Sequence, residues 1–197
     1  SLIKQLTLKY HGRLNPKLWK GDQLREGFAE ILVKKAYEFA SYSGVSKSRI
    51  KDIVITGGNV NYNYTKFSDI DIHLMCDLSG LDSDKLYDKK VTWTNSHKQL
   101  KIAGYPMEFY CADNKEHFPN GQGVYSIMFN KWLIVPKHLD HVDVLHDPKV
   151  IEKVNHYVKY IKQLIKSGTE KEIKDFKEKL HNMRSSGLHH GGEFSVE

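Results

Sequence analysis

Two aspartates, Asp69 and Asp71, stand one residue apart in Ser68–Met75, a segment that alternates polar and apolar side chains. Successive side chains of a β-strand point to opposite faces, so both carboxylates would project together while the apolar residues enter a core. Adjacent carboxylates repel each other unless a cation lies between them. Carboxylate oxygens suit Mg²⁺, which takes its remaining ligands from water and substrate phosphates. The pattern predicts a divalent metal site at the two aspartates.

A pair of glycines, Gly57 and Gly58, lies upstream of the aspartates and ends the apolar run Arg49–Thr56, which is typical of a buried strand. Because glycine has no side chain, the backbone N–H groups of such a turn can approach phosphate oxygens closely. The turn is therefore a candidate binding site for a phosphorylated substrate.

A second Asp-x-Asp, at Asp82 and Asp84, shows that the spacing alone is a weak signal. One such pair is expected by chance in a chain with this much aspartate. The second pair lies in a polar stretch without strand alternation, and we interpret it as solvated surface. The first pair is distinguished by its context of strand, glycine turn and serine.

This combination resembles the signature of the polymerase-β-like nucleotidyltransferase superfamily, in which a strand and Gly-Gly or Gly-Ser precede Asp-x-Asp by ten residues. Gly58 and Asp69 have that gap, and Ser68 completes the common Ser-Asp-x-Asp form. The resemblance covers about residues 22–112 and looks closest to small stand-alone bacterial or phage members. It implies a mixed sheet, two Mg²⁺ or Mn²⁺ ions, an NTP substrate and a third carboxylate on a later strand.

Glu108 is the best third carboxylate, since it lies in an apolar strand with Met107 and Phe109 on the opposite face. An unpaired carboxylate there would be costly without a partner. The alternative for Glu108 is an edge-strand position facing water. Asp113 is a fallback ligand, but its place at the strand end is more typical of a turn.

The chain departs from the resemblance at Gly58, where family members generally carry a serine whose hydroxyl contacts the NTP phosphates. Asn59, Ser68 or backbone amides are candidate substitutes, and altered activity is one consequence to test. Lys66 and Lys98 are candidate phosphate contacts, and Tyr64 is a candidate for stacking on a base, each with a surface or packing role as the alternative. His73 shares the face of the aspartates, where a packing or supporting role is expected.

The predicted fold is α/β (α+β), with a mixed β-sheet core, flanking helices and a C-terminal helical extension. Residues 1–147 would form the core, 148–185 a helical pair and 186–197 a tail. The elements expected from periodicity and turn residues are a helix over Asp22–Tyr42, strands over 49–56, 68–75, 100–103 and 107–112, a short helix or loop over 80–95, a hairpin over 123–128 and 132–135, and helices over 148–166 and 169–183, the latter starting with a capping box of Thr169 and Glu172.

Composition and charge bear on what the protein binds and on the compartment in which it is found. The formal net charge is +6, which suits an anionic substrate but is also common without one. The many lysines after Pro148 fit either a solvated face or contact with nucleic acid. No apolar run is long enough to cross a membrane, the N-terminus does not read as a signal peptide, and the two cysteines, Cys76 and Cys111, look like core residues of a reducing compartment. We therefore expect a cytoplasmic protein, in a bacterium or a phage-infected host.

Three functions are compatible with these residues. The leading one is transfer of NMP from an NTP to a hydroxyl of an RNA 3′ end, a protein or a small molecule. A neighbouring one is synthesis of a signalling nucleotide, such as a cyclic oligonucleotide or a (p)ppGpp-like product. The non-enzymatic alternative is a nucleotide- or RNA-binding protein of the same fold, which the glycine at position 58 favours and the three carboxylates disfavour.

Overall fold

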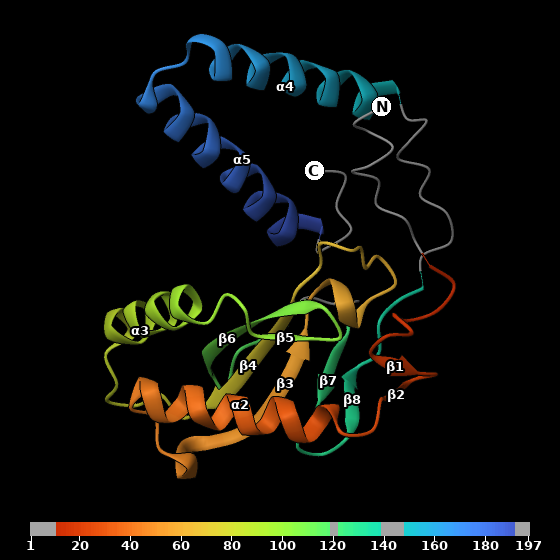
Figure 1. Cartoon of the computed structure of the whole chain (residues 1–197), viewed down its shortest axis with the longest axis vertical. Helices are drawn as coiled ribbons and strands as arrows, with labels where there is room; N and C mark the ends of the chain where they lie inside the picture. The colour runs from red at the N-terminus through yellow and green to blue at the C-terminus, as the bar shows by residue number, and fades with distance from the viewer. Residues whose placement is uncertain (1–10, 119–121, 139–147, 192–197) are drawn as a thin grey trace. The chain divides into compact units, whose positions relative to one another are not determined.

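Six strands of the described residues form one mixed sheet, in the order β5-β6-β4-β3-β7-β8 (Figure 1). The computed structural model describes residues 11–118, 122–138 and 148–191. Strands β4 and β6 are parallel, and the other neighbouring strands are antiparallel. With four α-helices in the described residues, the architecture is the mixed α+β class that the sequence predicts. The strands are β3 (Ile50–Thr56), β4 (Ile70–Cys76), β5 (Lys101–Ile102), β6 (Tyr105–Asp113), β7 (Val124–Ser126) and β8 (Lys131–Ile134).

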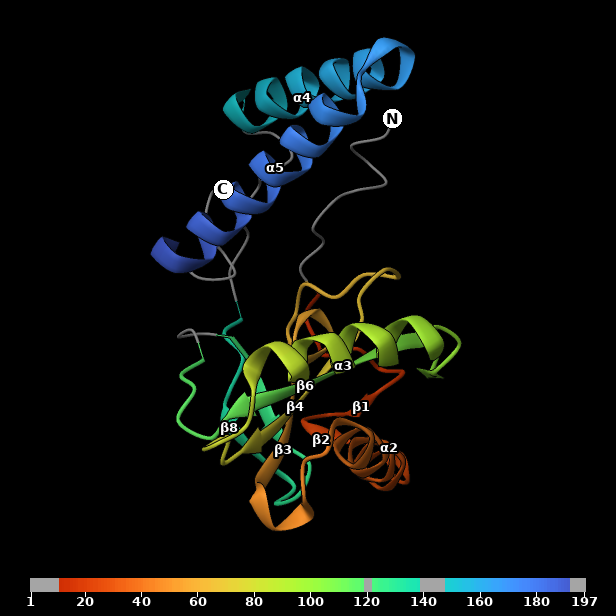
Figure 2. The same ribbon diagram turned by 90° about the vertical axis from the view of Figure 1, so that its left-hand side faces the viewer.

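The first helix begins later than its periodicity predicts. Helix α2 spans Phe28–Ser43, because Gln23–Leu24 form strand β2, which pairs with β1 (Trp19–Lys20). Figure 2 shows this small hairpin leading into α2, which is seen almost along its axis. Gly27, at φ 81°, turns the chain from the hairpin into the helix. The prediction of a helix starting at Asp22 was wrong. Leu24 fits the helical spacing of apolar residues, but it belongs to strand β2 of the hairpin that precedes the helix.

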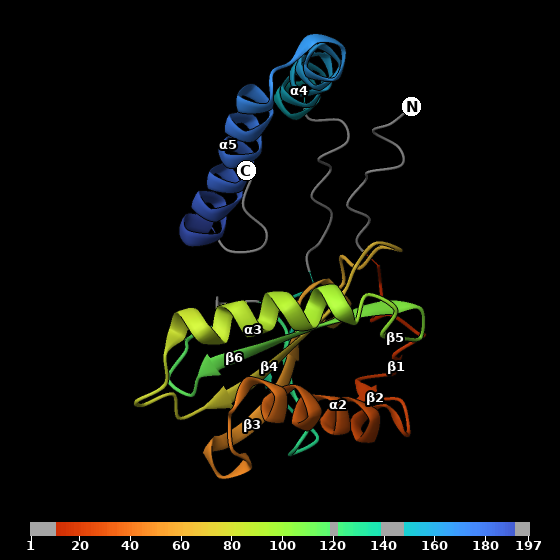
Figure 3. The same ribbon diagram turned by 60° about the vertical axis from the view of Figure 1, so that its left-hand side comes forward.

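Helices α2 and α3 (Ser83–Ser96) cover one face of the sheet (Figure 3). Phe39 of α2 packs 5.6 Å from the rings of both Trp93 of α3 and Phe109 of β6, measured between ring centroids. The opposite face of the sheet carries a smaller apolar cluster that includes Val54 and Ala112. Because side chains alternate along a strand, every second residue of β4 and β6 lies on the face away from the helices.

Helix α3 is longer than the short helix or loop predicted for residues 80–95. Its start is fixed by Asp82, whose carboxylate accepts the backbone N–H groups of Asp84 and Lys85. Trp93 is its one buried residue, so its apolar periodicity is weak. The second Asp-x-Asp pair is therefore an exposed helix start, in agreement with its interpretation as surface.

Two hairpins complete the sheet. The turn between β5 and β6 is Ala103-Gly104, both at positive φ, so Tyr105 and Pro106 belong to β6 and not to the turn as predicted. Strands β7 and β8 form the predicted hairpin and are antiparallel; β7 is shorter than expected, and β8 begins and ends one residue earlier than expected.

The described residues form two compact units, residues 11–138 and residues 148–191. The second unit contains helices α4 (Pro148–Ser167) and α5 (Glu170–Gly191). The predicted capping box is confirmed: Glu172 accepts the backbone N–H of Thr169 at 2.8 Å, and the Thr169 hydroxyl accepts the N–H of Glu172 at 3.3 Å. The prediction that the helix ends near residue 183 was wrong, because α5 continues to Gly191. Residues 192–197 of the predicted tail lie outside the described residues.

None of the helices in the described part of the chain is long and apolar enough to cross a membrane.

Candidate metal centre

The parallel pair β4 and β6 places two of the predicted carboxylates side by side. Asp71 lies opposite Glu108 in the register of these strands. The neighbouring pair, Ile70 and Met107, is buried on the side of the helices. The alternation that puts these apolar residues into the core therefore puts both acidic residues on the other face. Asp69 lies directly before β4 and not within it, since the strand begins at Ile70 and not at residue 68 as predicted.

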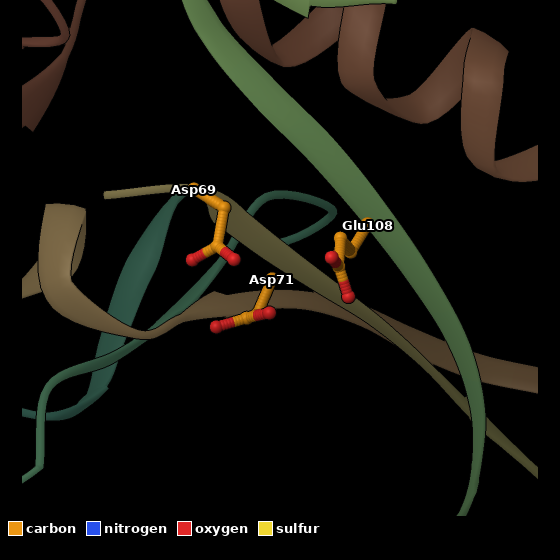
Figure 4. Close-up of side chains that lie close together, drawn as sticks. All are labelled: Asp69, Asp71 and Glu108. Carbon is orange, nitrogen blue, oxygen red and sulfur yellow. The ribbon is translucent and has the colours of Figure 1, made fainter. Parts of the chain in front are cut away.

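The three carboxylates meet. Asp69, Asp71 and Glu108 each offer an oxygen, and these oxygens lie within 4.8 Å of one another (Figure 4). All three residues are half-buried. Negative charges at such separations repel strongly where water is partly excluded, and a cation between them reverses the sign of that energy. The cluster could therefore hold a metal ion, and a donor set made only of carboxylate oxygens suits Mg²⁺ or Mn²⁺.

Glu108 is held by a neighbour on its own strand. The Tyr110 hydroxyl donates a hydrogen bond to Glu108 Oε2 at 2.7 Å. The pKa of Tyr110 is raised well above its usual value, by burial first, then by this hydrogen bond and by the nearby carboxylates. The tyrosine is therefore a neutral donor that orients the glutamate. The ammonium group of Lys90 lies over the ring of Tyr110, 3.9 Å from its centroid.

His73 is a packing residue of the same face, as expected. Its ring stacks on that of Tyr110 with 4.9 Å between centroids, and Phe118 meets it edge-on at 5.6 Å. Its Nδ1 is buried without a hydrogen-bond partner. Burial, and secondarily the charge of Lys90, lowers the pKa of His73 to about 4. The imidazole is thus neutral at physiological pH and supports the tyrosine that contacts Glu108.

Gly57 is required by the geometry of the site. Its backbone has φ 84°, a conformation that favours glycine, and it directly follows β3. A Cβ atom at this position would meet Oδ2 of Asp71 far inside van der Waals distance. Strand β3 pairs with β4 so that Thr56 lies opposite Asp71. The glycine turn therefore lies against the Asp71 carboxylate, although Gly57 and Asp71 are 14 positions apart in the sequence.

Asn59 has a role that the sequence did not reveal. It was predicted to contact a nucleotide, but its side chain is fully buried. Its Nδ2 donates to the backbone oxygen of Asp69 at 2.8 Å, and its Oδ1 accepts from Asn15 at 2.7 Å. Its own backbone oxygen accepts from the indole N–H of Trp19 at 2.8 Å. The asparagine therefore connects the glycine turn, the N-terminal segment and the first metal-ligand candidate.

The remaining predicted nucleotide contacts lie on the loop between Gly58 and Asp69. The Ser68 hydroxyl accepts the backbone N–H of Thr65 at 2.9 Å, and it lies 2.8 Å from where a Cβ of residue 58 would be. The space that a serine at position 58 would use is thus taken by the Ser68 side chain. Tyr64 stacks on His11 with 3.8 Å between ring centroids, so one face of its ring is covered. The Lys66 side chain is exposed.

The secondary candidates lie elsewhere. Asp113 lies opposite Cys76 at the far end of β6, where its Oδ1 accepts the N–H of Lys115 as a turn residue does. Lys98 is exposed beyond the end of α3. Cys76 is buried and Cys111 half-buried on neighbouring strands, and both are free thiols.

No family model, curated protein or solved structure matches this chain. We therefore infer the function from the geometry of the carboxylate cluster and from the Asp-x-Asp motif.

Proposed function

We propose that this chain is a metal-dependent nucleotidyltransferase, which transfers NMP from an NTP to an acceptor hydroxyl and releases pyrophosphate. The observation that carries the proposal is the cluster of Asp69, Asp71 and Glu108, whose oxygens lie within 4.8 Å beside the Gly57 turn. Carboxylates this close together repel one another where water is partly excluded, and a bound cation would offset that repulsion. The Asp-x-Asp motif and its spacing from the glycines supply the reaction class.

The three carboxylates would hold two Mg²⁺ or Mn²⁺ ions. When bound, such ions lower the pKa of an attacking hydroxyl and neutralise charge on a leaving pyrophosphate. The fit is supported by the chemistry of the donors, which are all hard oxygen ligands. It is also supported by Gly57, because the Asp71 carboxylate occupies the space that any side chain at position 57 would fill.

Groups of the protein would bind the triphosphate and accept the proton of the acceptor hydroxyl. The N–H groups of the Gly57-Gly58 turn would bind the triphosphate. The acceptor oxygen forms a bond to the α-phosphorus while the bond from that phosphorus to the bridging oxygen breaks, so pyrophosphate leaves. Glu108, oriented by Tyr110, takes the proton of the acceptor hydroxyl. The acceptor is the hydroxyl of an RNA 3′ end, a protein or a small molecule.

Pyrophosphate release tests the proposal. The purified chain would be incubated with Mg²⁺ or Mn²⁺ and each of the four NTPs, with and without total RNA. We expect metal-dependent release that disappears in an Asp69→Ala/Asp71→Ala variant. An Asp82→Ala/Asp84→Ala variant is the matched control, because it removes the same motif from an exposed helix start and should keep full activity.

The other outcomes of this experiment separate the alternatives. Metal-dependent NTP binding without any product would indicate a nucleotide- or RNA-binding protein of the same fold. A soluble cyclic, oligomeric or pyrophosphorylated nucleotide, formed without an added acceptor, would indicate a signalling-nucleotide synthase.

A further inference from the structure

One aromatic side chain close in sequence to the candidate metal ligands is largely exposed to solvent. Phe67 is 71% exposed, the most exposed aromatic residue among the large hydrophobic side chains of the described residues. It lies two positions before Asp69, so the two Cα atoms are at most about 7 Å apart. Leaving a phenyl ring in water forgoes about 2 kcal/mol of burial free energy, which a bound ligand could recover.

The turn that carries Phe67 is firmly built. The backbone N–H of Phe67 donates to the Thr65 hydroxyl at 3.1 Å, and that of Ser68 donates to the Thr65 backbone oxygen at 3.2 Å. The Ser68 hydroxyl accepts the Thr65 N–H and lies against Gly58. The ring is therefore presented by a hydrogen-bonded turn, whose Ser68 side chain lies against Gly58.

The positive charge of Lys66 beside the Phe67 ring suits a nucleotide. The Lys66 ammonium lies 4.8 Å from the centroid of the Phe67 ring, over one face. The large exposed fraction of Phe67 shows that the ring keeps open surface for a planar partner. A phenyl face stacks on any nucleobase, and a neighbouring ammonium attracts phosphate. Tyr64, the base-stacking residue predicted from the sequence, already stacks on His11.

We infer that Phe67 stacks on the base of the NTP bound at the carboxylates, with Lys66 close to its phosphates. This inference rests on the proposed function, since it places the nucleotide at that same site. Stacking on a phenyl ring tolerates all four bases, so Phe67 would supply affinity without selecting one nucleotide.

The test compares two ligands that differ in the base. Binding of α,β-methylene-ATP and of inorganic tripolyphosphate would be measured by calorimetry in Mg²⁺. We expect Phe67→Ala to weaken binding of the ATP analogue about five- to a hundredfold and to leave that of tripolyphosphate unchanged, whereas Phe67→Trp retains both. Because tripolyphosphate lacks a base, a variant that merely disturbs the turn would weaken both ligands.

Phe129 offers a matched control. It is 59% exposed and has the Lys131 ammonium 5.7 Å from its ring centroid. It lies in the β7–β8 turn, where its backbone N–H donates to the hydroxyl of Ser126, the last residue of β7. That hydroxyl donates to Asp52, which lies toward the opposite end of β3 from Gly57. Phe129→Ala should leave both affinities unchanged.

Different results would contradict the stacking role of Phe67 and the proposed function. Equal affinity of wild type and Phe67→Ala for the ATP analogue, or equal weakening of both ligands, would overturn the stacking role alone. A wild-type chain that binds neither ligand in Mg²⁺ would overturn the proposed function as well.

Discussion

At the scale of single residues, the site depends on a contact that neither partner shows in the sequence. Gly57 has no side chain, and Asp71 uses the space that this leaves. The sequence predicts that the glycine pair binds phosphate, and the structure adds that Gly57 is needed to admit Asp71, a candidate metal ligand. Gly57 lies beside Asp71 because β3 and β4 are neighbours in the sheet.

Substitution of Gly57 tests this contact, with Gly80 as the control. Both glycines have positive φ, and a Cβ at Gly80 would meet nothing within 4 Å. Gly80→Ala should lose about 1–2 kcal/mol of unfolding free energy from backbone strain alone. Gly57→Ala should lose a further 1–3 kcal/mol from overpacking against Asp71 and should also weaken Mn²⁺ binding. Urea unfolding and Mn²⁺ titration measure the two effects, and equal losses in the two variants would contradict the role of the contact.

The candidate site was largely predictable residue by residue, because strand alternation places Asp71 and Glu108 on one face. The supporting residues were not. Asn59 was predicted to face a ligand, whereas it is buried in a hydrogen-bond network with Asn15 and Trp19. Such a network joins segments about 40 residues apart, and no local pattern reports it. Tyr110 could have been found by the same alternation that identified Glu108, since the two share a face.

At the scale of elements, strands with strong apolar patterns were predicted well, and elements made of polar residues were not. The β3 run is apolar and bounded by glycine, and it was located within one residue. Helix α3 buries only Trp93, so its sequence shows little periodicity and its extent was underestimated. The two-residue strands β1 and β2 are stabilised by tertiary contacts, such as the stacking of Trp19 on Trp132 at 4.9 Å, and short-range patterns do not predict these.

Strand β3 also gives a pH-dependent prediction. Burial raises the pKa of Asp52, against opposing hydrogen bonds from Ser126 and the Ile53 N–H. The folded protein therefore binds this proton more tightly than the unfolded chain, and the contribution of Asp52 to stability decreases as pH rises through its folded pKa. We expect Asp52→Asn to be more stable than wild type at pH 7.5, with the advantage shrinking toward pH 4. Urea unfolding across this range measures it.

Asp77 provides a control of opposite sign. Hydrogen bonds from the Ser79 hydroxyl and N–H lower the pKa of Asp77, so its stabilisation is present at neutral pH and is lost as pH falls. Asp77→Asn should therefore be less stable than wild type at pH 7.5, and this deficit should shrink on acidification. If the two variants followed the same pH trend, burial would not be the dominant influence on Asp52.

At the scale of the whole molecule, helices α4 and α5 are densely basic. Residues 148–191 contain ten Lys and Arg and five Asp and Glu, a net charge of +5 in 44 residues. Every carboxylate of the candidate metal centre, by contrast, belongs to the first unit. The lysines after Pro148, which fit either a solvated face or contact with nucleic acid, therefore lie in the unit that does not contain the candidate metal ligands.

Because all the candidate ligands lie in one unit, metal binding should stabilise the two units unequally. A ligand that binds only the folded form shifts the opening equilibrium of the region that holds it. Hydrogen exchange with and without Mn²⁺ should show slower exchange at residues 54–72 and 105–110 and no change at residues 148–191. Uniform slowing across both units would contradict a site confined to the first.

Direct Mn²⁺ binding tests whether Asp69, Asp71 and Glu108 form a divalent metal centre. Calorimetry would be carried out on the full chain, on an Asp69→Asn/Asp71→Asn variant and on an Asp82→Asn/Asp84→Asn variant, which removes equal charge at the exposed start of α3. We expect saturable binding by the wild type and by the Asp82→Asn/Asp84→Asn variant, and loss of binding in the Asp69→Asn/Asp71→Asn variant. Undiminished binding after the Asp69→Asn/Asp71→Asn change, or no binding by the wild type, would contradict this expectation.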